Sequence, residues 1–442
     1  MSLSASPVAP LAAHDLLMFL LQIGVLLGTA VLLGRLAQRL GMPAVAGELC
    51  AGVLLGPSLL APLAPGLAAW LLPQRPGPMH LLDAVGQLGV LLLVGVTGMG
   101  VDLGLVRRKG KAALLVSAGG LVVPLVCGAA AALAIPATLL VDGVDRTVFA
   151  LFTGVALCVS ALPVIARTLL DMGLLHRDIG QLTIGASLVD DLAGWLLLSV
   201  VSAMATTGVH GPDVLWSVAS LAAFLACARF VGGPLVRRAL RWSARSGGGD
   251  SVPAVCTVLI LLGAAAGHAL HMEAVIGAFL VGVLIGSCAE FDRERAAPLR
   301  VVAVTVLAPL FFATAGLRID LTALVRPEVA GSALLVLFVA VAGKYAGVYA
   351  GARAGRLGHW EGLALGAGMN ARGVIGVIIA MVGLRLGVLT AEMYTIVVLV
   401  AIVTSVMAAP LMRLAVRRMP VTAEERLRER VTAGGPGVES NS

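Results

Sequence analysis

Long apolar blocks constrain the fold of this chain more than any other feature of its sequence. From about residue 15 to 415, blocks of roughly 20 apolar residues alternate with short loops, and each block is long enough to cross about 30 Å of hydrocarbon. Water is absent from that layer, so the backbone groups must bond within each block, which makes the block a helix. Only 12% of the residues are charged. The sequence therefore predicts an all-α polytopic membrane protein.

We expect about thirteen transmembrane helices. No basic segment precedes the first block and no small-residue cleavage site follows it, so we interpret it as a permanent helix and not as a signal peptide. The expected spans are 15–34, 43–60, 82–105, 112–134, 147–169, 180–206, 214–236, 252–270, 273–290, 298–316, 330–351, 361–384 and 389–415.

The basic residues indicate which side of the membrane each loop faces. With thirteen spans, most Lys and Arg residues between the spans fall in the odd-numbered loops. The even-numbered loops hold only Arg75, Arg146, Arg318, Arg326 and Arg385. Cytoplasmic loops carry the basic excess, so we expect residues 1–14 to be a leader outside the cell membrane and residues 416–442 to be a short cytoplasmic tail. The tail is polar, and we expect residues 425–442 to be dispensable for activity.

Two spans in opposite halves of the chain are interrupted. Span 214–236 would connect six spans on either side, and the two halves would enter the membrane in opposite senses, as in an inverted repeat. The fifth span carries Ser160 and Pro163 near its middle, where a proline removes a backbone hydrogen bond. The twelfth contains GAGMNARGVIG, which includes Asn370. Broken helices at matching positions indicate the binding site of a transporter.

Charged residues inside the spans are the strongest candidates for function. Asp190 and Asp191 lie in span 180–206, and a carboxylate at the bilayer centre costs roughly 2.5–3.5 kcal/mol to insert. Neighbours on a helix point about 100° apart, so one can hold a fixed partner while the other faces a water-filled cavity. Lys344, in span 330–351, needs a carboxylate if it stays charged. Asp190 is the candidate, because Asp191 is better left free.

Two further charged groups lie at membrane depth. Arg372, in the interrupted twelfth span, keeps its proton and needs acceptors. Backbone carbonyls freed by the interruption, Asn370 or an aspartate would serve. Glu48, in the second span, either lines the cytoplasmic approach to the site or pairs with a basic loop. The six cysteines lie in different apolar blocks without metal-ligand spacing, so we expect no cofactor and no metal beyond a transported ion.

Five stretches give the chain a resemblance to a known family. They are GELCAGVLLGPSLL (47–60), GMGVDLGLVRRKGK (98–111), SALPVIARTLLDMGLLHRDIGQLTIGASLVDDLAGW (160–195), APLFFATAGLRIDL (308–321) and GMNARGVIGVIIAMVGLRLGVLT (368–390). At these residues the chain resembles the second family of monovalent cation:proton antiporters, and within it the branch of plant-type cation/proton exchangers. The third stretch is the most specific.

The resemblance implies a fold. It is the inverted-repeat sodium/proton antiporter fold, in which the broken fifth and twelfth helices cross. The core would comprise the helices at about 112–206 and 330–415, and would move as an elevator. The helices at about 15–105 and 252–316 would dimerise, and the helix at about 214–236 would link the two units.

The resemblance also implies roles for individual residues. Asp191 would bind the cation and the proton, while Asp190 would pair with Lys344. The chain departs from the family at Gly100 and Gly376, where many members carry an acid. Arg372 therefore lacks its usual acidic neighbour, one turn further along the helix.

The predicted function is secondary active exchange of a monovalent cation, Na⁺ or K⁺, for protons. The alternative is sodium-coupled or proton-coupled transport of an organic solute on the same scaffold. An intramembrane aspartyl protease needs two acids that face each other from different helices, which Asp190 and Asp191, as neighbours, do not. We therefore expect no enzyme. The expected partners are the ions, the lipid bilayer and a second copy of the chain in a homodimer. The +7 net charge is spread along the loops and predicts no nucleic-acid site.

Overall fold

The computed structural model is helical throughout the part of the chain that it describes. It describes residues 12–72, 76–100, 103–174, 177–207, 223–245, 251–270, 274–289, 291–420 and 425. The one extended pairing in that part is an isolated bridge between Leu140 and Leu389. Nine of the helices described there are long and apolar enough to cross a membrane, and the count is ten if one bent pair is a single span. The all-α fold is confirmed, and the count of about thirteen stays a prediction.

The helices follow one another along the chain with short connections. In the first half they are α1 (Ala13–Arg39), α2 (Ala44–Leu55), α3 (Leu60–Leu63), α4 (Pro65–Leu71), α5 (Pro76–Met99), α6 (Leu103–Leu133), α7 (Arg146–Cys158), α8 (Leu162–Asp171) and α9 (Asp178–Thr207). In the second half they are α11 (Gly233–Arg245), α12 (Ser251–Ala269), α13 (Ala274–Gly286), α14 (Ala297–Val302), α15 (Ala308–Gly316), α16 (Pro327–Ala354), α17 (His359–Met369), α18 (Gly373–Arg385) and α19 (Ala391–Val416).

Three regions named from the sequence lie partly or wholly outside the described residues. They are most of the leader at 1–14, the first part of the connecting span at 214–236, and most of the tail at 416–442. The described part of the connecting span ends in a π-helical turn at Ala228–Gly232 and continues into α11. That helix extends to Arg245, beyond the expected end at 236, because Val236 and Leu240 bury one face of it against α12 and α13.

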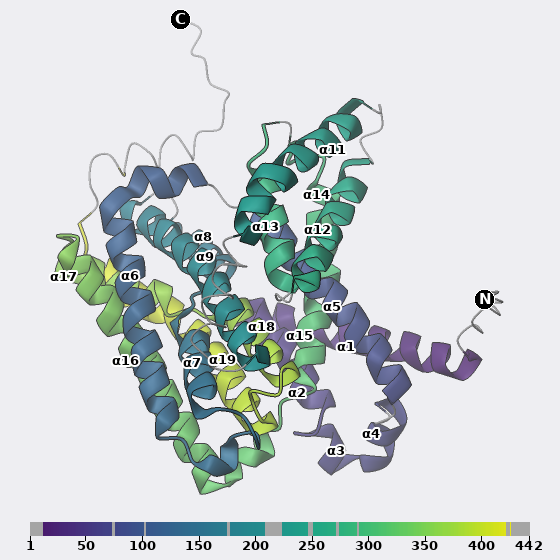
Figure 1. Ribbon diagram of the computed structural model, residues 1–442. Helices are drawn as coiled ribbons and strands as arrows, with labels where there is room; N and C mark the ends of the chain where they lie inside the picture. Colours follow the sequence, from purple (N-terminus) through teal and green to yellow (C-terminus); the bar gives the residue numbers. More distant parts are fainter. Residues whose placement is uncertain are drawn as a thin grey trace, which may run out of the picture.

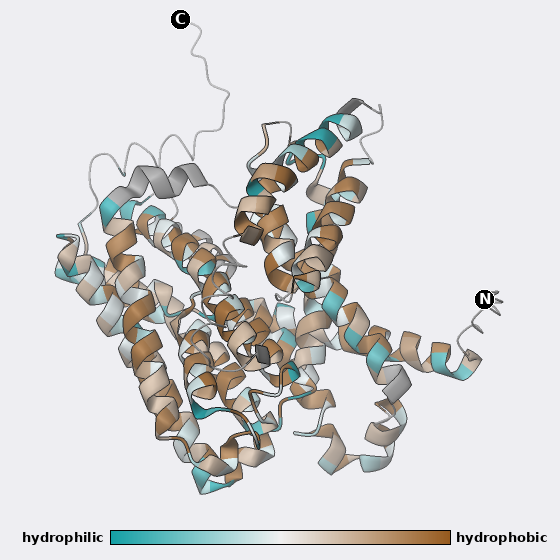
Figure 2. Ribbon diagram, viewed as in Figure 1, coloured by the Kyte–Doolittle hydropathy of each residue, from teal (hydrophilic) through white to brown (hydrophobic). Residues whose placement is uncertain are grey.

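The helices pack in two groups (Figure 1). We call α6 to α9 and α16 to α19 the crossing group, and α1, α2, α5, α12, α13 and α15 the flanking group. Contacts within each group are far more extensive than those that join α2 and α15 to α18 and α19. Figure 2 shows apolar residues along most of the helices. Large apolar side chains on the outer faces of α6 and α16 are exposed, including Val126 and Phe338, as is required of helices that contact hydrocarbon.

Glycines set the closest helix contacts in both groups. A Cβ atom on Gly119 of α6 would lie 2.2 Å from the carbonyl oxygen of Gly347 in α16, and a Cβ on Gly347 would lie 2.1 Å from that of Gly119. A Cβ on Gly52 of α2 would similarly lie 2.0 Å from the carbonyl oxygen of Ala313 in α15. Backbones approach this closely only where side chains are absent.

Two helices are broken where the sequence predicts interruptions. The chain is extended between α7 and α8, and it bends by 47° between α17 and α18. The two breaks touch, because the Ala161 backbone N–H donates to the Ala371 carbonyl at 2.8 Å. Pro163 does not kink a continuous helix. It is the second residue of α8, where a missing N–H leaves no intrahelical bond unmade.

Gly347→Ala should lower the melting temperature of the protein in detergent by several degrees, because the added methyl group would collide with the α6 backbone. The matched control is Gly331→Ala on the same helix, where a Cβ meets nothing within 4 Å. That change should be neutral or slightly stabilising, since alanine is the better helix former. Equal melting temperatures for the two variants would contradict the packing described for α6 and α16.

Candidate functional site

Asp190 and Asp191 are both buried in α9, but their surroundings differ. The exposed fractions of the two residues are 0% and 1%. Asp190 accepts hydrogen bonds from Ser117 in α6 at 2.6 Å and from Ser160 in the first break at 2.8 Å. It also forms an ion pair with Lys344 at 2.7 Å. Its carboxylate is therefore held from three directions.

The Lys344 ammonium is satisfied completely. Besides Asp190, it donates to the carbonyl oxygens of Gly120 at 2.9 Å and Cys158 at 2.6 Å. An ammonium group has three hydrogens, so no donor is left over. Cys158 is the last residue of α7, and its carbonyl is available because the helix breaks there. The expected pair between Lys344 and Asp190 is present, and the first break supplies part of its support.

Asp191 has no such set of partners. Within the part of the chain that the structure describes, its Oδ1 atom is buried without a hydrogen-bond partner. The backbone N–H of Leu162, at the start of α8, is directed at the carboxylate. Asp191 thus faces the first break and is the less constrained of the two acids.

The second break carries further unsatisfied polar groups. Among the described residues, neither the oxygen nor the nitrogen of the Asn370 amide has a partner, although the residue is fully buried. Asn370 precedes Ala371, whose carbonyl bonds the first break. Ser160 is also within 2.9 Å of the Met369 carbonyl, and its one hydroxyl proton serves either this acceptor or Asp190 at a time. The crossing therefore gathers Asp191 and polar atoms of both breaks.

Arg372 lies at the start of α18 and is 1% exposed. Its Nη2 atom donates to the Ala340 carbonyl of α16 at 2.7 Å, while Nε and Nη1 are buried without partners among the described residues. The acceptor is a helix carbonyl, and not one freed by the break as the sequence suggested. One turn further along α18, Gly376 places no acid beside the guanidinium.

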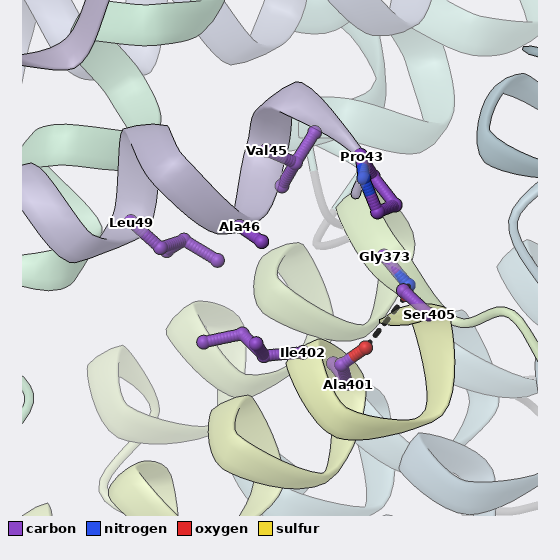
Figure 3. Close-up of a pocket in the computed structure, with 8 residues that line it drawn as sticks. All are labelled: Pro43, Val45, Ala46, Leu49, Gly373, Ala401, Ile402 and Ser405. Atoms are coloured by element: carbon purple, nitrogen blue, oxygen red, sulfur yellow. Dashed lines mark hydrogen bonds between the residues drawn. The ribbon is translucent and has the colours of Figure 1, made fainter. Parts of the chain in front are cut away.

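Glu48 lies away from this cluster. It is 9% exposed in α2, and its side chain packs against Gly34 of α1. A small apolar pocket of about 220 Å³ lies on another face of α2, between Pro43, Val45, Ala46, Leu49 and the residues Gly373, Ala401, Ile402 and Ser405 (Figure 3). Ser405 there accepts the Gly373 N–H at 2.9 Å and so caps α18. Glu48 does not line this pocket and has no ion pair with any described residue.

Ser117 was not identified from the sequence. A lone serine in an apolar helix is a common packing residue, and nothing in the sequence places it opposite Asp190. Pro163 contributes its backbone position at the start of α8, and its side chain lies outside the part that the structure describes.

A family model decides where this chain belongs. Residues 26–414 match the model described as "Sodium/hydrogen exchanger, transmembrane". The chain belongs to the sodium/hydrogen exchanger family. It is a multi-pass membrane protein, and the resemblance drawn from the five sequence stretches is confirmed.

Curated relatives of this exchanger-family chain are antiporters. It is 32% identical over 405 residues to the Na(+)/H(+) antiporter NhaS4 of Synechocystis, covering 90% of this chain and 97% of the relative. It is 28% identical to the Na(+)/H(+)-K(+) antiporter GerN of Bacillus cereus, covering 89% and 95%. It is 30% identical to Cation/H(+) antiporter 17 of Arabidopsis thaliana, but covers only 48% of that longer protein.

A solved structure agrees on the fold. The sodium proton antiporter MjNhaP1 from Methanocaldococcus jannaschii superposes with a TM-score of 0.67, covering 91% of this chain and 99% of that one, at 16% identity. At that identity the likeness concerns the fold alone.

Lys344→Met should lower the free energy of unfolding by about 3–5 kcal/mol, because it leaves Asp190 buried without its cation. The double variant Asp190→Asn with Lys344→Met removes both charges and should recover much of the loss. Thermal unfolding in detergent measures both effects. A single variant as stable as wild type would show that the pair contributes nothing to the fold.

Proposed function

We propose that this protein exchanges a monovalent cation, Na⁺ or K⁺, for protons, and that both compete for Asp191. The observation that carries the proposal is the division of labour between adjacent acids. Asp190 is fully bonded by Lys344 and two serines, whereas Asp191 is buried with an oxygen that has no described partner. A carboxylate kept at membrane depth without a partner is costly and is typical of an ion pathway.

The exchange follows from the cost of moving an empty charge. When Asp191 is ionised it attracts a dehydrated cation, and the amide oxygen of Asn370 and carbonyls of the broken helices complete the coordination. When Asp191 is protonated the cation leaves. Only the occupied or protonated site crosses the hydrocarbon cheaply, so the two ions move in opposite directions. Asp190 and Lys344 hold α6, α9 and α16 together throughout.

The packing supports an elevator type of alternating access. The crossing group contains Asp191 and both breaks, while the flanking group contacts it mainly through α2 and α15. We propose that the crossing group moves as a body and that the flanking group forms the homodimer in the bilayer. With the basic loops inside, the N-terminus lies outside and the C-terminus in the cytoplasm of a cell with this protein in its plasma membrane.

The names of the relatives support Na⁺ and K⁺ as the candidate cations, since NhaS4 is named for Na⁺ and GerN for Na⁺ and K⁺. We propose a transporter and not an enzyme.

Asp191→Asn should abolish cation-driven proton movement in everted vesicles, because asparagine keeps the shape of the side chain but cannot carry the proton. The protein should remain folded and inserted. Asp190→Asn is the matched control. It should lower the melting temperature, because Lys344 then keeps its charge without a counter-ion. Exchange at wild-type level in Asp191→Asn would refute the proposed function of this residue.

Arg372→Ala should impair exchange more than Arg229→Ala. Arg372 is buried beside the second break, whereas Arg229 is exposed in the π-helical turn before α11. Vesicle assays at matched expression would compare the two. A larger loss for Arg229→Ala would show that the second break is not part of the transport site.

A further inference from the structure

A carboxylate from beyond α19 caps the helix that carries the acid pair. Oε1 of Glu425 accepts the backbone N–H of Asp178, the first residue of α9, at 2.9 Å. Its Oε2 lies 3.4 Å from Nη2 of Arg177. Both side chains are buried, with Glu425 3% and Arg177 6% exposed. Two residues that are 248 positions apart thus form a buried contact at the start of α9.

The chain needs this carboxylate at that position. The first N–H groups of a helix have no partner inside it, and a residue before the helix normally supplies a side-chain oxygen. Arg177 occupies that place in α9, since its carbonyl accepts the N–H of Gln181. An arginine side chain carries only donors. Glu425 supplies the missing acceptor, and its negative charge is favourable at a helix N-terminus.

A second contact fixes the same segment. The Pro420 carbonyl accepts from Nη2 of Arg177 at 3.0 Å, so one guanidinium holds two points of the chain beyond α19. Just before them, the Arg418 guanidinium lies 4.5 Å from the centre of the Trp360 ring in α17. The end of α19 is therefore joined to the first half of one broken helix, and the segment after it is joined to the turn that follows the other.

We propose that Glu425 is a positioning residue for the transport site, which it controls through Arg177 and the first turn of α9. This inference rests on the proposed function and adds a residue to it. Asp190 and Asp191 lie in the fourth turn of the same helix, about 18 Å from Asp178 at 1.5 Å per residue. The latch of Glu425, Arg177 and Asp178 fixes the rotation and height of α9 where it leaves α8, and so fixes where Asp191 meets the first break.

The inference reverses the expectation that residues 425–442 are dispensable. The effect should depend on one residue of the tail and not on its length. Glu424→Ala is the matched control, because it removes the same charge one position earlier. Glu425→Gln is a graded variant, since its amide oxygen still accepts the Asp178 N–H but cannot balance Arg177.

The test uses the full chain in everted vesicles and in detergent. Glu425→Ala should raise the cation concentration for half-maximal exchange about tenfold, the order found when residues that orient metal ligands are removed. It should also shift the pH profile of exchange. Glu425→Gln should fall between Glu425→Ala and wild type, and Glu424→Ala should match wild type. Hydrogen exchange of the first α9 amides should accelerate in Glu425→Ala alone.

A merely structural contact gives a different result. If Glu425→Ala lowers yield or melting temperature but keeps the wild-type cation dependence and pH profile, the positioning proposal is overturned. Arg177→Gln should add little in the Glu425→Ala background, because the two act as one unit. A wild-type chain that neither exchanges cations nor is stabilised by them would instead overturn the proposed function, and the positioning role with it.

Discussion

The ion pair between Asp190 and Lys344 is the contact on which the arrangement of the membrane-embedded helices depends. It joins α9 to α16, and the groups that satisfy it come from α6 and from the end of α7. Burying two charges is unfavourable unless every remaining hydrogen bond is made. Here each hydrogen of the ammonium has an acceptor. The cost of the pair therefore fixes four helices relative to one another, and Asp191 is the neighbour that this network leaves out.

The broken helices have a structural role and a chemical one at the same place. The first break exposes the Cys158 carbonyl that Lys344 requires, and it positions Ser160 on Asp190. It also contacts the second break through Ala161 and Ala371. A continuous helix would have used these backbone groups internally. The interruption that weakens two helices thus supplies the acceptors and donors that stabilise the charges beside them.

The sequence predicted the fold class, the interrupted helices and the partner of Lys344, because these follow from membrane depth. An apolar block must be helical, a proline must disturb a helix and a buried lysine must find an acid. The sequence did not predict Ser117 or Glu425, because their importance depends on which helices meet. It also misjudged the acceptor of Arg372, which proved to be Ala340 on another helix. Glu48 illustrates the same limit, since its depth was evident but not the face of α2 on which it lies.

The glycine contact between α6 and α16 also acts as a ruler for charge. Gly119 and Gly347 determine how closely these helices approach, and the residues beside them, Gly120 and Lys344, hold an acceptor and the ammonium that must reach it. The separation of the backbones therefore decides whether a fully extended bond can close, although neither glycine carries any charge. In this protein an electrostatic property, the neutralisation of Asp190, is set by the absence of two methyl groups.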